Sequence, residues 1–181
     1  MFGLVEKWRQ RRPHRLTRLA AAIEALNERD RQLMEETAAV EHLRLQGAAD
    51  LHAVCRAFVN ALNSKLLSPA IDLDPAQYYP RTFNDSGPNI FQINLRGRLL
   101  QIDFTATEEL YCTDDFRRRY TLLGTVRSFN QELLSQNVVD EQTIYYCPEG
   151  VGARWYYFDC RTYRTGRVTP DFFAAELERL L

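Results

Sequence analysis

The first third of the chain carries a helical pattern of apolar side chains. From residue 16 onward, apolar residues recur at alternating spacings of three and four, which are the a and d positions of a heptad repeat. Every d position is apolar, whereas two of the a positions are the polar residues Asp30 and Thr37. Residues 14–46 contain neither glycine nor proline, so the pattern predicts a long helix. The candidate residues for self-association along this seam are Leu19, Ile23, Leu26, Leu33 and Val40.

A second amphipathic segment follows the first directly. The stretch from Ala49 to Leu66 places its apolar residues on one side of a helix. Gly47 lies between the two segments, so we expect either a helical hairpin or a helix pair across a dimer interface. We also expect a break or kink at Pro13, because proline removes a backbone donor. Residues 1–67 are therefore a predicted helical arm.

Residues 68–89 are predicted to be a linker. They hold four of the seven prolines of the chain, and proline does not continue a helix or a central strand. Tyr78, Tyr79 and Phe83 indicate that part of this segment packs against the rest of the protein. The remaining residues, 90–181, are the predicted sheet domain.

Alternating apolar and polar residues in this domain predict β-strands. The two-residue segment Arg96-Gly97 is a plausible hairpin turn between the first two strands. Ser128 and Gln131 form a capping box that predicts a short helix, and Thr169 followed by Pro170 predicts the start of the last one. The predicted strands are 90–95, 98–105, 119–126, 143–147 and 153–160.

The order of these elements predicts an α+β fold. We expect the long helix and the second helix to be followed by a roughly five-stranded antiparallel sheet, in the order β-β-β-α-β-β-α, with helices covering one face. This order is similar to that of small dimeric secretion chaperones, which bind partner segments on their sheets and helices. The similarity is one of topology and no motif accompanies it.

The residues that usually carry catalysis or bind metals form no motif. The four cysteines have no metal-ligand spacing, and no nucleophile elbow, zinc-protease helix or phosphate-binding glycine loop occurs. We therefore expect no catalytic residue, no metal and no cofactor. No apolar run is long enough to span a membrane and no signal peptide is expected, which favours a cytoplasmic protein with free thiols.

The distribution of charge adds two candidate surfaces. The chain as a whole carries a net charge of −1, yet residues 1–18 carry +5, which could favour membrane contact. We favour docking or disorder of that segment over membrane contact. Arginines next to aromatic rings in the sheet domain could bind single-stranded nucleic acid or a protein, although residues 96–167 hold ten acidic residues against ten arginines. The candidate interaction residues are Arg127, Arg154, Trp155, Tyr157, Tyr163 and Arg164.

The leading hypothesis is a non-enzymatic adaptor or chaperone-like protein. The helical arm would form a homodimer, and the sheet domain would hold another protein. The first alternative is a single-stranded nucleic-acid-binding module that uses an Arg/aromatic sheet face. The second is a small-molecule-binding domain with a pocket between sheet and helices.

Overall fold

A computed structural model describes residues 3–111, 116–129, 140–150 and 152–181. It divides into two compact units, residues 1–41 and residues 42–181. In chain order the described elements are α1 (Gly3–Asn63), β1 (Asp72–Asp74), the 3-10 turn η1 (Pro80–Thr82), β2 (Asn89–Leu95), β3 (Arg98–Tyr111), β4 (Tyr120–Phe129), β5 (Asp140–Glu149), β6 (Gly152–Asp159), β7 (Arg164–Arg167) and α3 (Pro170–Glu178).

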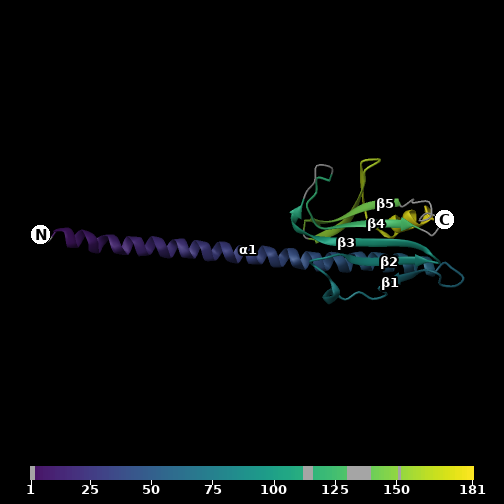
Figure 1. Cartoon of the computed structure of the whole chain (residues 1–181), viewed down its shortest axis with the longest axis horizontal. Coiled ribbons are helices and arrows are strands. Elements are labelled where there is room, and N and C mark those ends of the chain that lie inside the picture. The colour runs from purple at the N-terminus through teal and green to yellow at the C-terminus, as the bar shows by residue number, and fades with distance from the viewer. Residues whose placement is uncertain (1–2, 112–115, 130–139, 151) are drawn as a thin grey trace. The chain divides into compact units, whose positions relative to one another are not determined.

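The second unit is built on one antiparallel sheet whose strands lie side by side in chain order, from β1 to β7 (Figure 1). The predicted α+β class is confirmed, but the sheet has seven strands and the expected number of about five is wrong. The two additional strands are the edge strands. β1 is three residues long within the proline-rich segment, and β7 is a polar strand that contains Gly166, so neither has an apolar alternation to reveal it.

The predicted hairpin between β2 and β3 is confirmed. Leu95 is paired with Arg98 across a two-residue turn. Arg96 and Gly97 both have positive φ, at 47° and 88°. That combination is typical of the tight turns whose twist matches the twist of the two strands they join.

The expectation of two helices in the arm is wrong, because α1 continues through both Pro13 and Gly47. The reason at Gly47 is a close approach to the sheet. A Cβ at this position would lie 2.6 Å from the ring of Tyr146 and 2.7 Å from the side chain of Leu122. Glycine is used here because the helix backbone packs directly on the sheet, and not because the helix ends.

We expect Gly47→Ala to lower the free energy of unfolding by about 1–3 kcal/mol. At an exposed position inside a helix the same change stabilises by about 1 kcal/mol, so the sign of the effect tests the close packing. Tyr146 cannot yield easily, because its ring is fully buried and its hydroxyl donates to Asp50 at 2.8 Å. Urea denaturation followed by circular dichroism measures the difference, and an alanine variant more stable than the natural protein would contradict it.

The main core lies between the helices and one face of the sheet. From residue 42 onward α1 runs along the sheet, and α3 packs into the same apolar cluster (Figure 1). Hydrogen bonds also hold α1 on the sheet: the indole nitrogen of Trp155 donates to the carbonyl of Gly47 at 2.7 Å, and Tyr146 donates to Asp50. The fully buried members include Ala48, Leu51, Cys55, Ile93, Leu100, Ile102, Leu122, Ile144, Tyr146 and Phe173.

A second, smaller cluster covers part of the opposite face of the sheet. Tyr145 directly precedes Tyr146 in β5. Because neighbouring side chains of a strand point to opposite faces, Tyr145 lies on the face away from the helices. Its ring stacks on Phe116 with the centroids 4.0 Å apart. The buried members are Phe116, Tyr120, Tyr145, Cys147 and Tyr156.

The boundaries within the first half differ from the expected ones. The two compact units meet between residues 41 and 42, inside α1, rather than after residue 67. Residues 68–89 are also more than a linker, since Ile71 and Leu73 are buried in the main core and β1 pairs with β2. The packing expected of Tyr78 and Phe83 is confirmed, because both lie against that core, whereas Tyr79 is exposed.

The two predicted helix starts in the sheet domain have different outcomes. Ser128 caps no helix: it is a buried residue of β4, which continues to Phe129. The rest of that predicted helix, 130–137, lies outside the described residues. Thr169 is the N-cap of α3 and Pro170 its first residue, as expected, although the Thr169 side chain makes no capping hydrogen bond.

Candidate functional site

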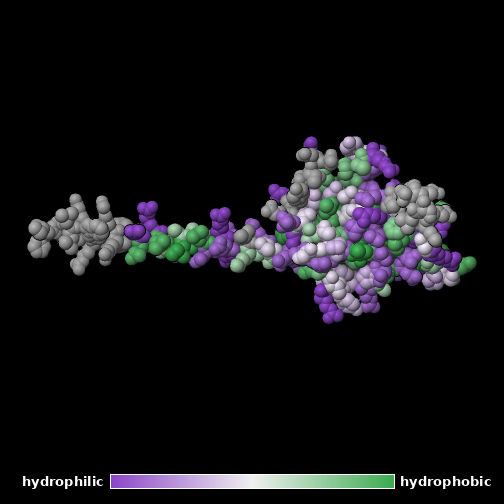
Figure 2. Space-filling view, in the orientation of Figure 1, coloured by the Kyte–Doolittle hydropathy of each residue, from purple (hydrophilic) through white to green (hydrophobic). Residues whose placement is uncertain are grey.

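The first candidate surface is an apolar stripe on the part of α1 that belongs to the first unit. Large aliphatic side chains recur here at spacings of three, four and three residues, and all of them are exposed (Figure 2). Their exposed fractions are 67% for Leu16, 56% for Leu19, 49% for Ile23 and 57% for Leu26. Large apolar side chains that gather on one face of a helix usually mark an interaction surface.

The other predicted members of this seam are partly visible. Val40 is half-buried and Asp30 and Thr37 are exposed, while the Leu33 side chain lies outside the described part. Three charged side chains just beyond the stripe pair within the helix: Arg31 contacts Glu28 at 2.7 Å and Glu35 at 3.2 Å. Such exposed ion pairs stabilise a helix only slightly. The apolar stripe is therefore the feature of this segment that can contribute most to an interaction.

Arg127 lies on the sheet face opposite the helices, between two carboxylates from neighbouring strands. Its guanidinium contacts Asp103 on β3 at 2.8 Å and Glu141 on β5 at 3.1 Å. The hydrogen bond to Glu141, helped by the charge of Asp103, raises the pKa of Arg127 above its ordinary value. The charge of Arg127 is therefore compensated within the sheet, which reduces its value as a free cation for an anionic ligand.

Farther along the same face, three guanidinium groups surround one carboxylate. Glu149 lies 3.6 Å from Arg154, 3.7 Å from Arg118 and 3.8 Å from Arg167. It also accepts a hydrogen bond from the hydroxyl of Tyr156 at 2.8 Å, and this bond together with the arginines lowers the pKa of Glu149. Three positive charges face a single negative one, so this Glu149 cluster is a local basic surface.

The six candidate interaction residues do not form one surface. Trp155, only 3% exposed, belongs to the main core, and Tyr157 stacks on Phe172 of α3 at 4.9 Å. Arg154 points to the opposite face because it is next to Trp155 in β6, and there it joins the Glu149 cluster.

The remaining candidates lie near the last turn of the sheet. Tyr163, 77% exposed, lies in the turn before β7 with a φ of 53°. Arg164 is an exposed residue of β7. Sequence alternation alone could not decide which of the neighbouring aromatic residues 155–158 faces the core. The answer depends on which face the helices cover.

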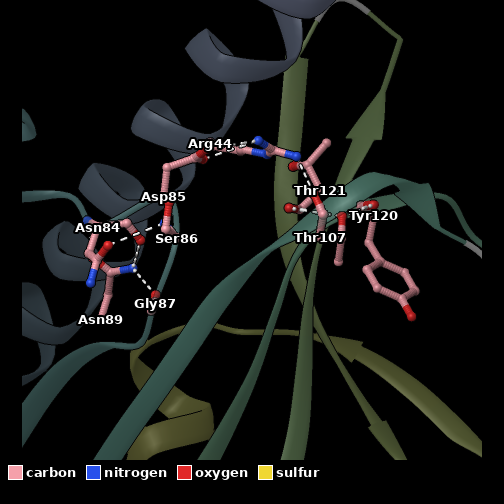
Figure 3. Close-up of polar contacts among 9 residues, drawn as sticks. All are labelled: Arg44, Asn84, Asp85, Ser86, Gly87, Asn89, Thr107, Tyr120 and Thr121. Atoms are coloured by element: carbon pink, nitrogen blue, oxygen red, sulfur yellow. Dashed lines mark hydrogen bonds and ion pairs between the residues drawn. The ribbon is translucent and has the colours of Figure 1, made fainter.

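Sequence reasoning missed Arg44, which joins α1 to two other parts of the second unit (Figure 3). Its side chain is 9% exposed and contacts Asp85 at 3.1 Å. The same guanidinium donates to the backbone carbonyl of Thr107 on β3. A hollow of about 520 Å³ lies beside it, lined in part by Ser86, Thr105 and Glu108.

The loop that carries Asp85 is itself held in place (Figure 3). The side chain of Asn89 donates to the carbonyl of Asn84 at 2.9 Å and accepts from its N–H at 2.8 Å. This arrangement presents Asp85 to Arg44. The sequence does contain a signal for Arg44. This arginine lies seven residues after Thr37 and so occupies the next a position, which places a cation in the heptad seam.

We expect Arg44→Leu to destabilise the second unit by about 1–3 kcal/mol, since the carbonyl of Thr107 would lose its charged donor in a part-buried position. Asp85→Asn should cost less, because half of the Asp85 side chain is exposed and an amide can still accept from Arg44. Paired urea denaturation curves of the two variants measure this difference. No loss for Arg44→Leu would show that Arg44 does not hold the loop and β3 to α1, and equal losses would show that its contact with Thr107 adds nothing to its contact with Asp85.

The cysteines with described side chains differ in reactivity. Cys55 and Cys147 are buried and Cys160 is exposed. Burial raises the pKa of Cys147 to about 12 and raises that of Cys55 as well, so both thiols stay protonated at neutral pH. Because only the thiolate attacks alkylating reagents, neither has the environment of a catalytic nucleophile.

Iodoacetamide applied to the folded protein at about pH 8 should therefore modify Cys160 and spare Cys55 and Cys147. Peptide mapping by mass spectrometry identifies the modified sites. A control in denaturant should show all three modified, and modification of Cys147 in the folded protein would contradict its burial.

Neither a metal centre nor a membrane span is found in the part of the chain that the structure describes. No group of three histidine, cysteine or acidic side chains there could hold a metal ion. His42 is exposed, and the ring of His52 is buried with its Nε2 atom 2.8 Å from the carbonyl oxygen of Pro75. Among the described residues, no helix is both long and apolar enough to cross a membrane.

Comparison of the chain with family models, with curated proteins and with solved structures gives no match.

Proposed function

We propose that this protein is a non-enzymatic interaction module of adaptor or chaperone-like type that self-associates through residues 16–40 of α1. The observation that carries the proposal is the exposed stripe of Leu16, Leu19, Ile23 and Leu26. Burying a leucine or isoleucine side chain contributes about 1.5–3 kcal/mol. A helix that exposes four such side chains is therefore stabilised when the apolar face of another helix covers them. Heptad spacing is the pattern that lets two such faces interlock.

The second unit supports the role of a partner-binding domain in this proposal. The sheet face opposite the helices is only partly covered by the smaller aromatic cluster, and it carries the exposed guanidinium groups of the Glu149 cluster. Arginine is common in protein interfaces because it combines a flat, partly apolar group with several donors. An adaptor would offer this face to another protein while α1 holds two copies together.

The same observations give less support to the alternatives. Binding of single-stranded nucleic acid needs rings on which bases stack, and the rings of Tyr145 and Tyr156 beside the arginines are buried. A small-molecule site would need unsatisfied polar groups facing a pocket. In the hollow beside Arg44 the guanidinium already contacts Asp85 and the carbonyl of Thr107, so of this group only the Nε atom, which makes no hydrogen bond within the described residues, is left for a ligand.

Size-exclusion chromatography with light scattering on the full chain tests self-association directly. The expected mass is twice the 21.1 kDa of one chain at high concentration, decreasing toward the monomer on dilution. A mass of one chain at every concentration would reject the proposal. The measurement is repeated in high salt, because apolar association persists there whereas adhesion of oppositely charged surfaces does not.

A further inference from the structure

The segment of α1 that carries the apolar stripe has opposite charges at its two ends. At the N-terminal end, residues 15–23 contain Arg15 and Arg18 and no acidic residue. At the other end, residues 32–41 contain Glu35, Glu36 and Glu41 and no basic residue, and only Glu35 has a described ion pair, with Arg31 just before this end. All five side chains are exposed. The segment is therefore positive at one end and negative at the other, and the basic residues before it extend the positive end.

We propose that two copies of this segment pair in antiparallel orientation, an inference that rests on the proposed self-association. In a parallel pair the two positive ends would lie side by side, and so would the two negative ends. In an antiparallel pair each positive end lies beside a negative end of the second copy. Like charges held along neighbouring helices destabilise a pair and opposite charges stabilise it, so the distribution of charge favours the antiparallel arrangement.

The polar residue in the middle of the seam favours the same orientation. In a parallel pair Asp30, at an a position, would face Asp30 of the second copy in the apolar layer. Bringing two carboxylates together there is costly. In antiparallel coiled coils a positions face d positions instead. When the two seams overlap along their whole length, from residue 16 to residue 40, Asp30 lies beside Leu26 of the second copy.

That register also pairs the remaining positions of the seam. It places Leu16 opposite Val40, and Ile23 opposite Leu33, of the second copy. Thr37 faces Leu19, so each polar a position meets an apolar partner. Along the axis, the level of Arg15 then coincides with the level of Glu41 of the second copy, so the positive end of each helix lies beside the negative end of the other.

A spin label at Ala39 distinguishes the two orientations without changing the seam, because Ala39 is exposed and lies at an outward-facing c position. The label is attached to an Ala39→Cys variant of the full chain in which Cys112 and Cys160 are serine. In the antiparallel register, residue 39 lies opposite residue 17, so two labels are separated by about 33 Å along the helix axis. In a parallel pair they are separated only across the two helices, by about 10–20 Å. A distance in the shorter range would overturn the proposal.

Neutralising the positive end gives a second test whose sign differs between the orientations. The variant is Arg15→Gln with Arg18→Gln. In an antiparallel pair this change removes attraction, and we expect the dimer dissociation constant to rise by about threefold to tenfold at low salt. In a parallel pair it removes repulsion, so the constant would fall. The difference should shrink in high salt, which screens exposed charges.

These tests separate failure of the orientation from failure of self-association. If the natural chain is a monomer at all concentrations, the proposed self-association fails and the orientation fails with it. If the natural chain is a dimer and the labels lie close together, or the glutamine variant dimerises more tightly, only the antiparallel orientation is wrong. Circular dichroism of each variant checks that its helix content is unchanged.

Discussion

The double variant Leu19→Asp with Leu26→Asp is expected to have the mass of a single chain in light scattering at concentrations where we expect the natural protein to be a dimer. Both residues are at d positions, and a dimer would bury four added carboxylates in its apolar seam. Burying a carboxylate without a partner costs several kcal/mol, which exceeds what the remaining apolar residues contribute. The stripe is the feature on which the proposed function depends, so this is the largest effect expected for any surface substitution.

A matched control adds the same charge to the same helix outside the seam. Ala21 and Ala25 are exposed and lie at outward-facing heptad positions, so Ala21→Asp with Ala25→Asp should leave the mass of the dimer unchanged. The fold of the second unit should be the same in both variants, because none of the four positions belongs to it. Loss of the dimer in both variants would show that added charge or reduced helix propensity, and not the seam, is responsible.

Heptad spacing could predict the apolar side of α1, but it could not predict which part of that side is covered by the sheet. Residues at the same helical spacing are exposed from 16 to 26 and buried from 48 to 59, within one continuous helix. The pattern is the same in both parts because a helix packed on a sheet and a helix packed on a helix both need one apolar side. Gly47 was interpreted as a helix end for a related reason: glycine serves both helix ends and close approaches, and its local sequence does not distinguish them.

The sheet was predictable where strands had alternating or strongly apolar faces. The turn at Arg96-Gly97 and the strands 143–147 and 153–160, which pair as β5 and β6, are predictable because their residues alternate or cluster. β1 and β7 were missed because an edge strand needs only one partner and little apolar content. Ser128 shows the reverse error, since a serine followed by a glutamine at the right spacing resembles a capping box even when the serine lies inside a strand.

The candidate site was predictable only in part, for a physical reason that Arg44 and Trp155 share. Both make their decisive contacts with residues more than sixty positions away, Arg44 with Thr107 and Trp155 with Gly47. A spacing rule describes neighbours within one element, so it predicts the stripe on α1 well and these contacts poorly. The residues proposed from composition alone, such as Tyr157, were divided between the core and the surface by the position of the helices.

The buried indole of Trp155 provides the second large effect. Trp155→Ala is expected to lower the free energy of unfolding by about 3–5 kcal/mol, which is the usual cost of emptying a site of this size in a core. The indole ring lies 5.3 Å from the ring of Tyr146 and 5.8 Å from that of Phe104. Removing it opens a cavity directly beneath the point where α1 approaches the sheet, so α1 would lose both its packing and its hydrogen bond there.

Two further variants separate these contributions and bound the effect. Trp155→Phe keeps most of the packing but leaves the carbonyl of Gly47 without its donor, so its cost should be lower and close to that of one unsatisfied buried group, about 1–3 kcal/mol. Tyr163→Ala removes an exposed ring near the end of the same sheet and should change the free energy by less than about 0.5 kcal/mol. Urea denaturation with an unchanged m-value measures all three. If Trp155→Ala cost no more than Tyr163→Ala, α1 would not be held on the sheet by this residue, and the division of α1 into a packed part and a part free to self-associate would lose its physical basis.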